Sequence, residues 1–584
     1  MQVIDYNYLD GKLNQVTTPE GIQTFSYLCN EKLATVTEGT ESLTYGYDGD
    51  LLTSLTYNGV LDTTINYRHN NKFQVDQVTY AGQTNAISYD DDGLATQIGQ
   101  FTITNHAEHG LPTKVEDTAL SQTLAYNGYG ERTTSQTQFG SAALFDYSLT
   151  YDISGTITGK TESLPDGSTQ TFVYGYDSRK RLTSVTKNGT VVEQYSYDAN
   201  GNRSLYSSTE RGLSNIASTY NIGDQLSSRG NTQYAYDANG RLSKKTEGTD
   251  VTHYQYSSTG RLLAVELPNG DTITYQHNAL GNRVVKLVND VVEEKYLWQN
   301  KTTLLATYDA NDNLLQRYEY SLGQTPTAFT QGTNRFYIIT DQIGTPRVIT
   351  DATGTVVKQI EYDAYGNVIN DTNPAMDIPF GFAGGLKDNH TGLIRFGYRD
   401  FDPEIGRWTA RDPIGFAGGD TNLYGYVGGS PIQFVDSTGM ARYHYNKNNG
   451  YLYYYEDGVP LDPLWAMSVY SGWHNPANKW AIPNGRYEVL PIENTSNSAM
   501  CDEYDNCWFV PFKPLSDMPM RDGLPRCTSV GDGGSGRCGF HPEDKPHKPG
   551  TNGCISFPNY DYSIWLKNFF ASHPGVLIVS GSYE

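Results

Sequence analysis

The sequence has no run of basic residues and no long apolar stretch, and each absence excludes a class of protein. Asp and Glu number 65 against 42 Lys and Arg, which gives a formal net charge of −23. A general nucleic-acid binder neutralises phosphates with clustered Lys and Arg, so this balance argues against nucleic acid as a partner. No apolar stretch approaches the roughly 18 residues that cross a bilayer, so we expect no membrane span.

The first residues, MQVIDYNYLDGKL, have neither the charged nor the apolar region of a secretory signal. We therefore expect export by a route that needs no signal peptide. Because the chain opens inside a repeat-like pattern, we also expect it to be a fragment of something longer.

Cysteine is scarce and unevenly placed. Of six cysteines, Cys29 stands alone and the other five lie between positions 501 and 554. This asymmetry indicates two chemical units, a long cysteine-poor part and a short cysteine-bearing tail.

Tyrosine and glycine are abundant, with 46 and 59 copies in 584 residues, while charged residues are only 18%. A disordered chain would show few aromatics and high charge. Tyrosine suits a half-wet β-surface and glycine suits tight turns, so the composition predicts a folded, mainly β protein.

A strand–turn–strand unit recurs about every 20 residues. Copies begin at Tyr174 (YGYDSRKRL), Tyr195 (YSYDANGNR), Tyr234 (YAYDANGRL), Tyr254 (YQYSSTGRL) and Tyr275 (YQHNALGNR). Asp or Asn bonds the turn backbone and Gly adopts positive φ, so each copy predicts a hairpin. One hairpin cannot bury its own face, whereas many stacked hairpins form a continuous sheet.

These motifs resemble the YD-repeat, or RHS, family. The resemblance sharpens in TDQIGTPRVITDATGTVVKQIEYDAYGNVI and in the stretch from GFAGGLKDNHTG to FVDSTGM, which resembles the RHS core-associated segment. It implies a mainly β fold in which a β-sheet cocoon encloses a hollow and a variable toxin tail. We divide the chain into a YD-repeat shell (1–336), a core-associated segment (337–440) and a C-terminal toxin domain (441–584).

Two aspartate turns, Arg411–Gly415 (RDPIG) and Asp436–Met440 (DSTGM), bracket the end of the core-associated segment. The resemblance implies an aspartyl self-protease in which Asp412 and Asp436 form the dyad, Arg411 holds charge and the Met440–Ala441 bond is cut. Two carboxylates held close cannot both ionise, so one keeps a proton while the other activates water. Ser437 stands where the family usually has Pro. The alternative is that both are only turns that Asp favours.

After Met440 the repeat pattern stops and Trp, Pro and Cys become frequent. Short strands are predicted within 451–457, 464–472, 485–493 and 575–581, and a helix within 562–573, which Pro574 ends. The tail is therefore predicted to be a small β-rich domain.

The stretch CGFHPEDKPHKPGTNGCISF places two histidines shortly before Cys554. A thiolate is a nucleophile that a nearby imidazole activates, so Cys554 is the predicted nucleophile and His541 its base, with His547 as the alternative base. Gly553 would let the backbone approach a substrate carbonyl.

This order, His first and then Thr-Asn-Gly-Cys, resembles the L,D-transpeptidase family. The resemblance implies that Thr551, Asn552 and Gly553 bind substrate beside the nucleophile Cys554. The family often has Ser-His-Gly-Cys and then Arg after one further residue, where this chain has Thr551, Asn552 and Ser556.

The tail cysteines allow other interpretations. Five cysteines leave one unpaired, and if that one is Cys554, then Cys501, Cys507, Cys527 and Cys538 can form two disulfides in three ways. All five could instead be structural, or Cys527, Cys538, His541 and Cys554 could bind zinc, although the spacing is not that of a usual finger. We expect catalysis without a metal or cofactor.

Together the two resemblances imply an interbacterial toxin exported by a type VI secretion machine through an N-terminal region outside this chain. Its tail would act on peptidoglycan stem peptides in the target periplasm, as an L,D-carboxypeptidase or L,D-transpeptidase, and the producing cell would hold an immunity protein. The alternatives are a different Cys–His peptidase or amidase, and a non-catalytic disulfide-rich binding tail on an adhesin-like shell.

Overall fold

The computed structural model describes residues 4–418 and 420–440, and beyond Met440 it describes only the backbone of short strands. Thirty-six strands, β1 to β36, form one sheet. Each strand pairs antiparallel with the next one along the chain, beginning with β1 and β2 and ending with β35 and β36. This meander, which we call the wall, confirms the predicted repeat of hairpins.

The first half of the wall comprises β1 (Asp5–Leu9), β2 (Lys12–Thr18), β3 (Gly21–Tyr27), β4 (Leu33–Glu38), β5 (Glu41–Asp48), β6 (Leu51–Asn58), β7 (Thr63–His69), β8 (Val75–Tyr80), β9 (Gln83–Tyr89), β10 (Ala95–Ile98), β11 (Phe101–Asn105), β12 (Pro112–Glu116), β13 (Leu120–Tyr126), β14 (Arg132–Phe139), β15 (Ala142–Tyr151), β16 (Ile157–Ser163), β17 (Thr169–Tyr176) and β18 (Leu182–Lys187).

The second half comprises β19 (Thr190–Tyr197), β20 (Arg203–Ser208), β21 (Leu213–Tyr220), β22 (Leu226–Arg229), β23 (Thr232–Tyr236), β24 (Leu242–Glu247), β25 (Asp250–Tyr256), β26 (Leu262–Glu266), β27 (Thr272–His277), β28 (Arg283–Val288), β29 (Val291–Trp298), β30 (Leu304–Tyr308), β31 (Leu314–Glu319), β32 (Ala328–Gln331), β33 (Asn334–Thr340), β34 (Pro346–Asp351), β35 (Val356–Tyr362) and β36 (Val368–Asp371).

The segment 379–440, which we call the plug, follows the wall. It comprises η1 (Phe382–Gly384), β37 (Leu386–Lys387), β38 (Ile394–Phe396), β39 (Arg399–Asp402), β40 (Arg407–Trp408), η2 (Gly415–Gly418) and η3 (Val427–Gly429). Its four strands form a separate small sheet.

The Asp-x-x-Gly turns of the wall have one recurring geometry. At the end of β19, Oδ1 of Asp198 accepts the N–H groups of Asn200 and Asn202, and Gly201 adopts φ 87°. The strand register shifts between Ser196 and Tyr197, directly before the aspartate, and equivalent shifts recur in most copies. Such β-bulges bend a strand and increase its twist, so the repeated bulge favours a sheet that curls.

The tyrosine of each motif also has a structural role. Its hydroxyl donates to a carbonyl in the preceding hairpin: Tyr176 to Ile157 at 2.8 Å, Tyr197 to Leu182 at 2.8 Å and Tyr220 to Arg203 at 2.9 Å. A phenol satisfies its own polar tip in this way while its ring packs against the sheet. The repeated tyrosine therefore links consecutive repeats, which explains the abundance of this residue.

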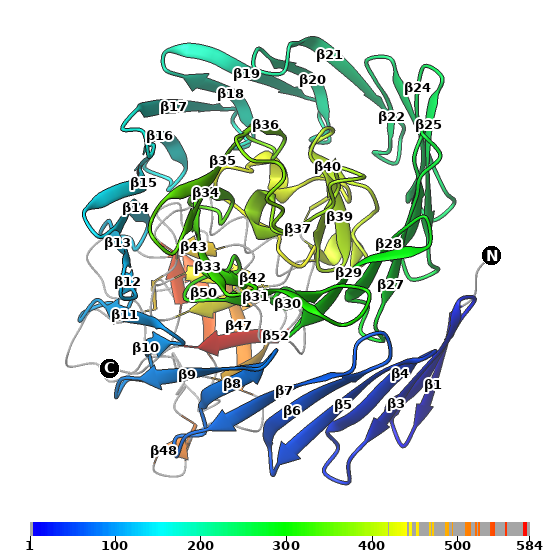
Figure 1. Cartoon of the computed structure of the whole chain (residues 1–584), viewed down its shortest axis with the longest axis vertical. Coiled ribbons are helices and arrows are strands. Elements are labelled where there is room, and N and C mark those ends of the chain that lie inside the picture. The colour runs from blue at the N-terminus through cyan, green and yellow to red at the C-terminus, as the bar shows by residue number, and fades with distance from the viewer. Residues whose placement is uncertain are drawn as a thin grey trace.

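The wall curls on itself (Figure 1). From β1–β9 it runs through β10–β17 and β18–β21 to β22–β28, and the last strands turn into the interior. Contacts between distant repeats close the curl, since the hydroxyl of Tyr57 donates to the carbonyl of Trp298 and that of Tyr80 to the carbonyl of Tyr318. Residues of β5–β8 and of β28–β34 accordingly share one apolar core.

The plug fills the inside of the curl with aromatic side chains. Phe396, Phe401, Trp408 and Tyr426 are buried and contact one another, with Phe401 and Tyr426 ring centroids 4.5 Å apart. The same apolar core includes residues of β11–β20 and of β33–β34. The plug is therefore continuous with the core of the wall.

Buried ion pairs fix the position of strands inside the curl. Glu162 of β16, fully buried, receives two hydrogen bonds from Arg347 of β34, at 2.7 and 2.9 Å. Asp400 of the plug is bracketed by Arg283 of β28 at 3.0 Å and by Arg395 at 2.7 Å. Both clusters pair buried charges and so avoid the penalty of an isolated buried ion.

The wall was predicted to enclose a hollow that holds the tail. In the part of the chain that the structure describes, the interior is occupied by β29–β36 and the plug, and the cavity between β18–β21 and the plug has a volume of about 180 Å³. Enclosure of the tail therefore stays a prediction. No helix among the described residues is long and apolar enough to cross a membrane.

The tail contributes twelve strands of assigned backbone, ten of them in one sheet. They are β41 (Tyr443–Asn446), β42 (Tyr451–Tyr454), β43 (Ala466–Ser468), β44 (Tyr470–Ser471), β45 (Gly485–Val489), β46 (Glu493–Asn494), β47 (Trp508–Pro514), β48 (Met520–Arg521), β49 (Leu524–Pro525), β50 (Cys538–Pro542), β51 (Ile555–Phe557) and β52 (Val576–Ser580). Strands lie within all four ranges predicted from the sequence. The helix predicted over 562–573 lies outside the described residues.

Candidate functional site

The first predicted aspartate, Asp412, forms its own turn with one carboxylate oxygen. Its Oδ1 accepts the N–H of Ile414 at 3.0 Å, and its carbonyl accepts the N–H of Gly415, which adopts φ 59°. This is the Asp-x-x-Gly geometry of the wall. The other carboxylate oxygen, Oδ2, is left free to contact a group outside the turn.

The second predicted aspartate, Asp436, also forms a turn with its Oδ1 and its carbonyl, but its Oδ1 accepts from four residues on. Its Oδ1 accepts the N–H of Met440 at 3.1 Å, and its carbonyl accepts the N–H of Gly439 at 3.4 Å. Met440 is buried. The residue before the predicted cleavage point is therefore hydrogen-bonded directly to one of the two predicted catalytic carboxylates.

One guanidinium joins the two aspartates. Nη2 of Arg399 lies 2.9 Å from Oδ2 of Asp412 and 3.0 Å from Oδ2 of Asp436. Arg399 is buried, and its guanidinium stacks over the ring of Trp408 at 4.2 Å from the centroid. Packing, a charge-assisted hydrogen bond to Asp436 and an ion pair with Asp412 therefore hold this side chain, and it brings together two carboxylates that are 24 positions apart in sequence.

Two glycines allow the second turn to approach β38 and β39 within the plug. A Cβ on Gly397 would lie 2.5 Å from the carbonyl oxygen of Thr438, and a Cβ on Gly439 would lie 2.9 Å from that of Phe396. Both adopt positive φ, 43° and 68°, and the N–H of Tyr398 donates to Thr438 at 2.8 Å. The close contact between β38–β39 and the Asp436 turn thus requires glycine on both sides.

The site raises the pKa of its carboxyl groups. Burial and the nearby Asp436 raise the pKa of Asp412 to about 6, against the lowering effect of Arg399. Burial also raises the pKa of Asp436, again opposed by Arg399. A third carboxyl, Asp420, has its pKa raised by burial and adds to the acidic cluster. The pair therefore keeps a proton at a pH at which ordinary aspartates are ionised.

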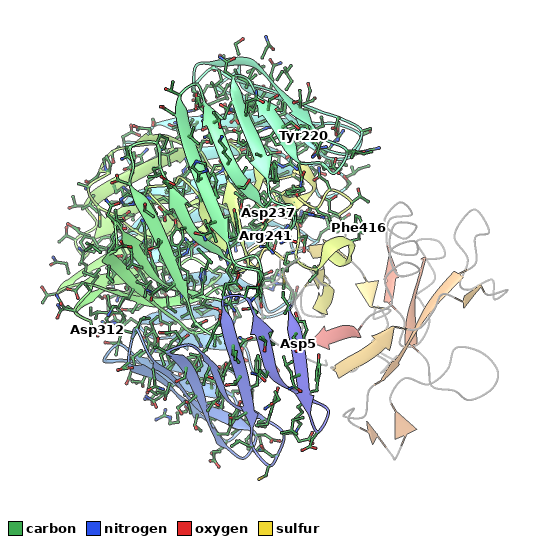
Figure 2. All side chains as sticks on the ribbon, turned by 90° about the vertical axis from the view of Figure 1, so that its right-hand side faces the viewer. Asp5, Tyr220, Asp237, Arg241, Asp312 and Phe416 are labelled. Carbon is green, nitrogen blue, oxygen red and sulfur yellow. The ribbon has the colours of Figure 1, made fainter. Side chains whose placement is uncertain are left out.

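Arg411, predicted to hold charge in the site, lies elsewhere. Its side chain is exposed and its Nε donates to the carbonyl of Asn239 at 3.2 Å, in the turn between β23 and β24. In Figure 2, the labels Asp237 and Arg241 mark this turn of the wall, and the label Phe416 marks η2 of the plug. Arg411 thus attaches the plug to the wall, and Arg399 occupies the position between the carboxylates. In the sequence, the feature that could have pointed to Arg399 is a charged residue at the start of β39, between the buried Phe396 and Phe401.

The predicted tail site falls mostly outside the described residues. This applies to Ala441, to Thr551, Asn552, Gly553, Cys554 and the alternative base His547, and to Cys501, Cys507 and Cys527. Cys538 and His541 belong to the backbone of β50, which pairs in parallel with β51 and places His541 opposite Ser556. Among the residues whose side chains the structure describes, Cys29 is free and exposed. The disulfide and zinc alternatives stay predictions.

Comparison with known proteins identifies relatives of the wall and plug. A family model for the Teneurin YD-shell matches residues 2–432. Mouse Teneurin-4 is 29% identical over 370 residues, which cover 61% of this chain and 13% of that protein. A protein of Dickeya dadantii named "Probable deoxyribonuclease RhsA" is 30% identical over 328 residues, 50% of this chain and 22% of that protein. The chain thus spans about a fifth or less of the length of these relatives.

Solved structures share the fold. A crystal structure of TcdB2-TccC3 matches with a TM-score of 0.52 and 17% identity over 75% of this chain and 28% of that one. The Photorhabdus luminescens Tc holotoxin pore matches with a TM-score of 0.55 and 17% identity, covering 75% of this chain and 26% of that one. At this identity the likeness establishes the shell fold alone.

Proposed function

The chain belongs to the Teneurin YD-shell family, and from this premise we propose that it is the shell of a toxin that cuts its own chain after Met440. Cleavage there releases residues 441–584 as a separate toxin domain. The observation that carries the proposal is the pair of aspartate turns that share Arg399, with the N–H of Met440 on Asp436. Their raised pKa values support the same conclusion.

The chemistry needs one protonated and one ionised carboxyl. The ionised carboxylate takes a proton from a water molecule that attacks the carbonyl carbon of Met440. The protonated carboxyl supplies a proton to the nitrogen of Ala441 when the C–N bond breaks. Arg399 holds both groups in position, and its positive charge offsets the cost of burying an ionised carboxylate.

The test is a time course of the full chain made by cell-free translation, with intact mass identifying the two fragments. We expect wild type to yield fragments that end at Met440 and begin at Ala441, and Asp412→Asn and Asp436→Asn to slow the reaction about a thousandfold. Asp351→Asn, in a wall turn of similar sequence, is the matched control and should cleave normally. An uncut wild-type chain, or normal cleavage of both aspartate variants, contradicts the proposal.

For the released tail we propose a peptidoglycan enzyme. Cys554 attacks the carbonyl between an L-centre and a D-amino acid of a stem peptide, expels the D-amino acid and forms a thioester, while His541 accepts and returns the proton. Water as acceptor gives an L,D-carboxypeptidase, and an amine gives an L,D-transpeptidase. The His-to-Cys motif order supports this assignment. So does the parallel pairing of β50, which contains His541, with β51, whose first residue follows Cys554 in sequence.

Two relatives support the toxin role in a general way. The Dickeya dadantii protein is named as a probable deoxyribonuclease, and the Photorhabdus luminescens pore is part of a holotoxin; both properties belong to those proteins. For this chain we propose export without a signal peptide by a type VI secretion machine, action in the periplasm of a rival cell, and protection of the producer by an immunity protein.

The tail is tested on tetrapeptide muropeptides, with the cleaved full chain as enzyme and mass spectrometry of the products. We expect loss or exchange of the terminal D-amino acid, and abolition of this reaction in Cys554→Ala and His541→Ala. Cys29→Ala, the control at an exposed cysteine of the wall, should keep full activity. Cleavage at another bond would favour a different Cys–His peptidase, and activity that survives Cys554→Ala would contradict a thiol mechanism.

A further inference from the structure

Hydroxyl side chains recur two positions after the aspartate of the wall turns, and there they all behave alike. In the Asp-x-x-Gly turns, Ser154 donates to Asp152 at 2.7 Å and Thr353 to Asp351 at 2.7 Å, in each case to Oδ1. In the Leu-Pro-Asp-Gly turn that begins at Leu164, Ser168 likewise donates to Oδ1 of Asp166, at 2.6 Å. In these turns the hydroxyl proton is therefore used to strengthen the turn itself.

Thr438 occupies the equivalent position in the Asp436 turn and behaves differently. Its Oγ1 is 3.5 Å from Oδ1 of Asp436, and its close contact is with the carbonyl oxygen of Met440. A carbonyl oxygen only accepts, so the hydroxyl is the donor, and it has a single proton to give. Thr438 is fully buried, so water does not compete for this proton.

The redirected hydroxyl lies on the bond that the proposed reaction breaks. The carbonyl of Met440 belongs to the peptide bond with Ala441, and the N–H of Met440 is held by Asp436 at 3.1 Å and by Oγ1 of Thr438 at 3.2 Å. Gly397 and Gly439 allow the same turn to pack closely against β38 and β39. The donor and the carbonyl are thus positioned together before any reaction occurs.

We propose that Thr438 is a catalytic residue of self-cleavage, which polarises the scissile carbonyl and stabilises the oxyanion that forms on it. The inference rests on the proposed self-cleavage. Water adds to the carbonyl carbon and gives one proton to the ionised aspartate, and the carbonyl oxygen becomes negative against the Thr438 hydroxyl. When the carbonyl reforms, the C–N bond breaks and the nitrogen of Ala441 takes the proton of the other carboxyl. The products are the Met440 carboxylic acid and the Ala441 amine, and the acid then gives its remaining proton to solvent.

The experiment follows cleavage of the full chain during cell-free translation for Thr438→Val, Thr438→Ser and the control Thr353→Val. Loss of one oxyanion donor typically slows a reaction about 100- to 1,000-fold, and we expect this for Thr438→Val. Thr438→Ser keeps a hydroxyl and should cleave within about tenfold of wild type, and Thr353→Val should cleave like wild type. The pH–rate profile of Thr438→Val should keep the inflection of wild type, because the aspartates are unchanged.

Other results separate the two proposals. If Thr438→Val cleaves at the wild-type rate while Asp412→Asn is blocked, self-cleavage stands and the role of Thr438 is wrong. Equal loss in the Val and Ser variants together with a shifted pH inflection would show that Thr438 only maintains the turn, which also overturns the inference. If wild type is not cut, or the aspartate variants cleave normally, the proposed function fails and the inference fails with it.

Discussion

The Asp351 turn of the wall and the Asp436 turn of the plug have almost the same sequence, Asp-Ala-Thr-Gly and Asp-Ser-Thr-Gly, and opposite properties. In both, Oδ1 accepts the N–H four residues on, at 3.0 and 3.1 Å, and the glycine adopts positive φ. Hydrogen bonding from Thr353 lowers the pKa of Asp351, whereas burial raises that of Asp436.

The comparison shows that one local turn serves two purposes. The backbone pattern depends on neighbouring residues only, so it repeats wherever Asp-x-x-Gly occurs. The contacts of the second carboxylate oxygen and of the threonine hydroxyl depend on the surrounding structure. In the plug, these two groups contact Arg399 and the carbonyl of Met440. Matched substitutions in the plug and in the wall test whether burial causes the difference between the two turns.

The largest expected effect on stability is the loss of the buried cation. Arg399→Gln leaves two buried carboxyl groups without their shared cation and should lower the free energy of unfolding by about 3–5 kcal/mol. Arg68→Gln removes the exposed pair with Asp76 in the wall, formed at 2.8 Å, and should leave the free energy of unfolding nearly unchanged, because solvent screens the two charges. Denaturant midpoints measure both, and equal losses would contradict the contrast between plug and wall.

A smaller effect should depend on pH. The pKa of Asp412 is about 6 in the folded protein against an ordinary 3.8, so the folded state binds more protons than the unfolded state between these values, and stability falls as pH rises through that window. Asp412→Asn removes this penalty. It should gain stability relative to wild type between about pH 4 and pH 6, by at most about 3 kcal/mol, and keep the gain above pH 6.

Asp351→Asn is the matched control for this pH dependence and should show the opposite sign. The pKa of Asp351 is lowered, so its contribution is present above the ordinary pKa and is lost as the pH falls. Thermal unfolding at a series of pH values distinguishes the two. A stability difference for Asp412→Asn that does not change with pH would show that its carboxyl does not titrate in this range.

A comparison of two glycines gives a smaller effect. Gly439→Ala combines positive φ with a Cβ 2.9 Å from a backbone oxygen, whereas Gly167→Ala has positive φ and open space. We expect about 1–2 kcal/mol of destabilisation for Gly167→Ala from the backbone alone, and a larger loss for Gly439→Ala accompanied by slower self-cleavage. Melting temperatures measure the loss of stability, and the cleavage time course measures the rate of self-cleavage. A normal cleavage rate in Gly439→Ala would mean that the Asp436 turn can shift without loss of activity.

The smallest expected effect concerns the tyrosines of the wall. Tyr176→Phe removes the hydrogen bond to the Ile157 carbonyl and should cost about 1 kcal/mol, with self-cleavage unchanged. A melting-temperature comparison with Tyr129→Phe, at an exposed tyrosine, provides the control. Equal melting temperatures for the two variants would show that the hydrogen bonds from tyrosine hydroxyls to the preceding hairpin do not stabilise the wall.

Much of the wall could be predicted from the sequence, because its information is local. Strand alternation and the Asp-x-x-Gly turn act within a few residues, so hairpins and their spacing follow from the repeat. The same reasoning marks Asp412 and Asp436 as turn residues and, through family resemblance, as a pair. It does not predict the register shift before Tyr197 or the partner of its hydroxyl, since both depend on the adjacent strand.

The sequence by itself determined the β class, the hairpin repeat and the residues that close each turn. Only the tertiary structure decided which charge lies between the two aspartates. It selected Arg399 over Arg411, although Arg411 adjoins Asp412 in sequence. The reason is that burial and the direction of a side chain are set by packing between distant segments, here the plug against the wall. A carboxyl whose pKa is low in an exposed wall turn has a raised pKa in the plug, because packing there buries it and a single guanidinium offsets only part of that effect.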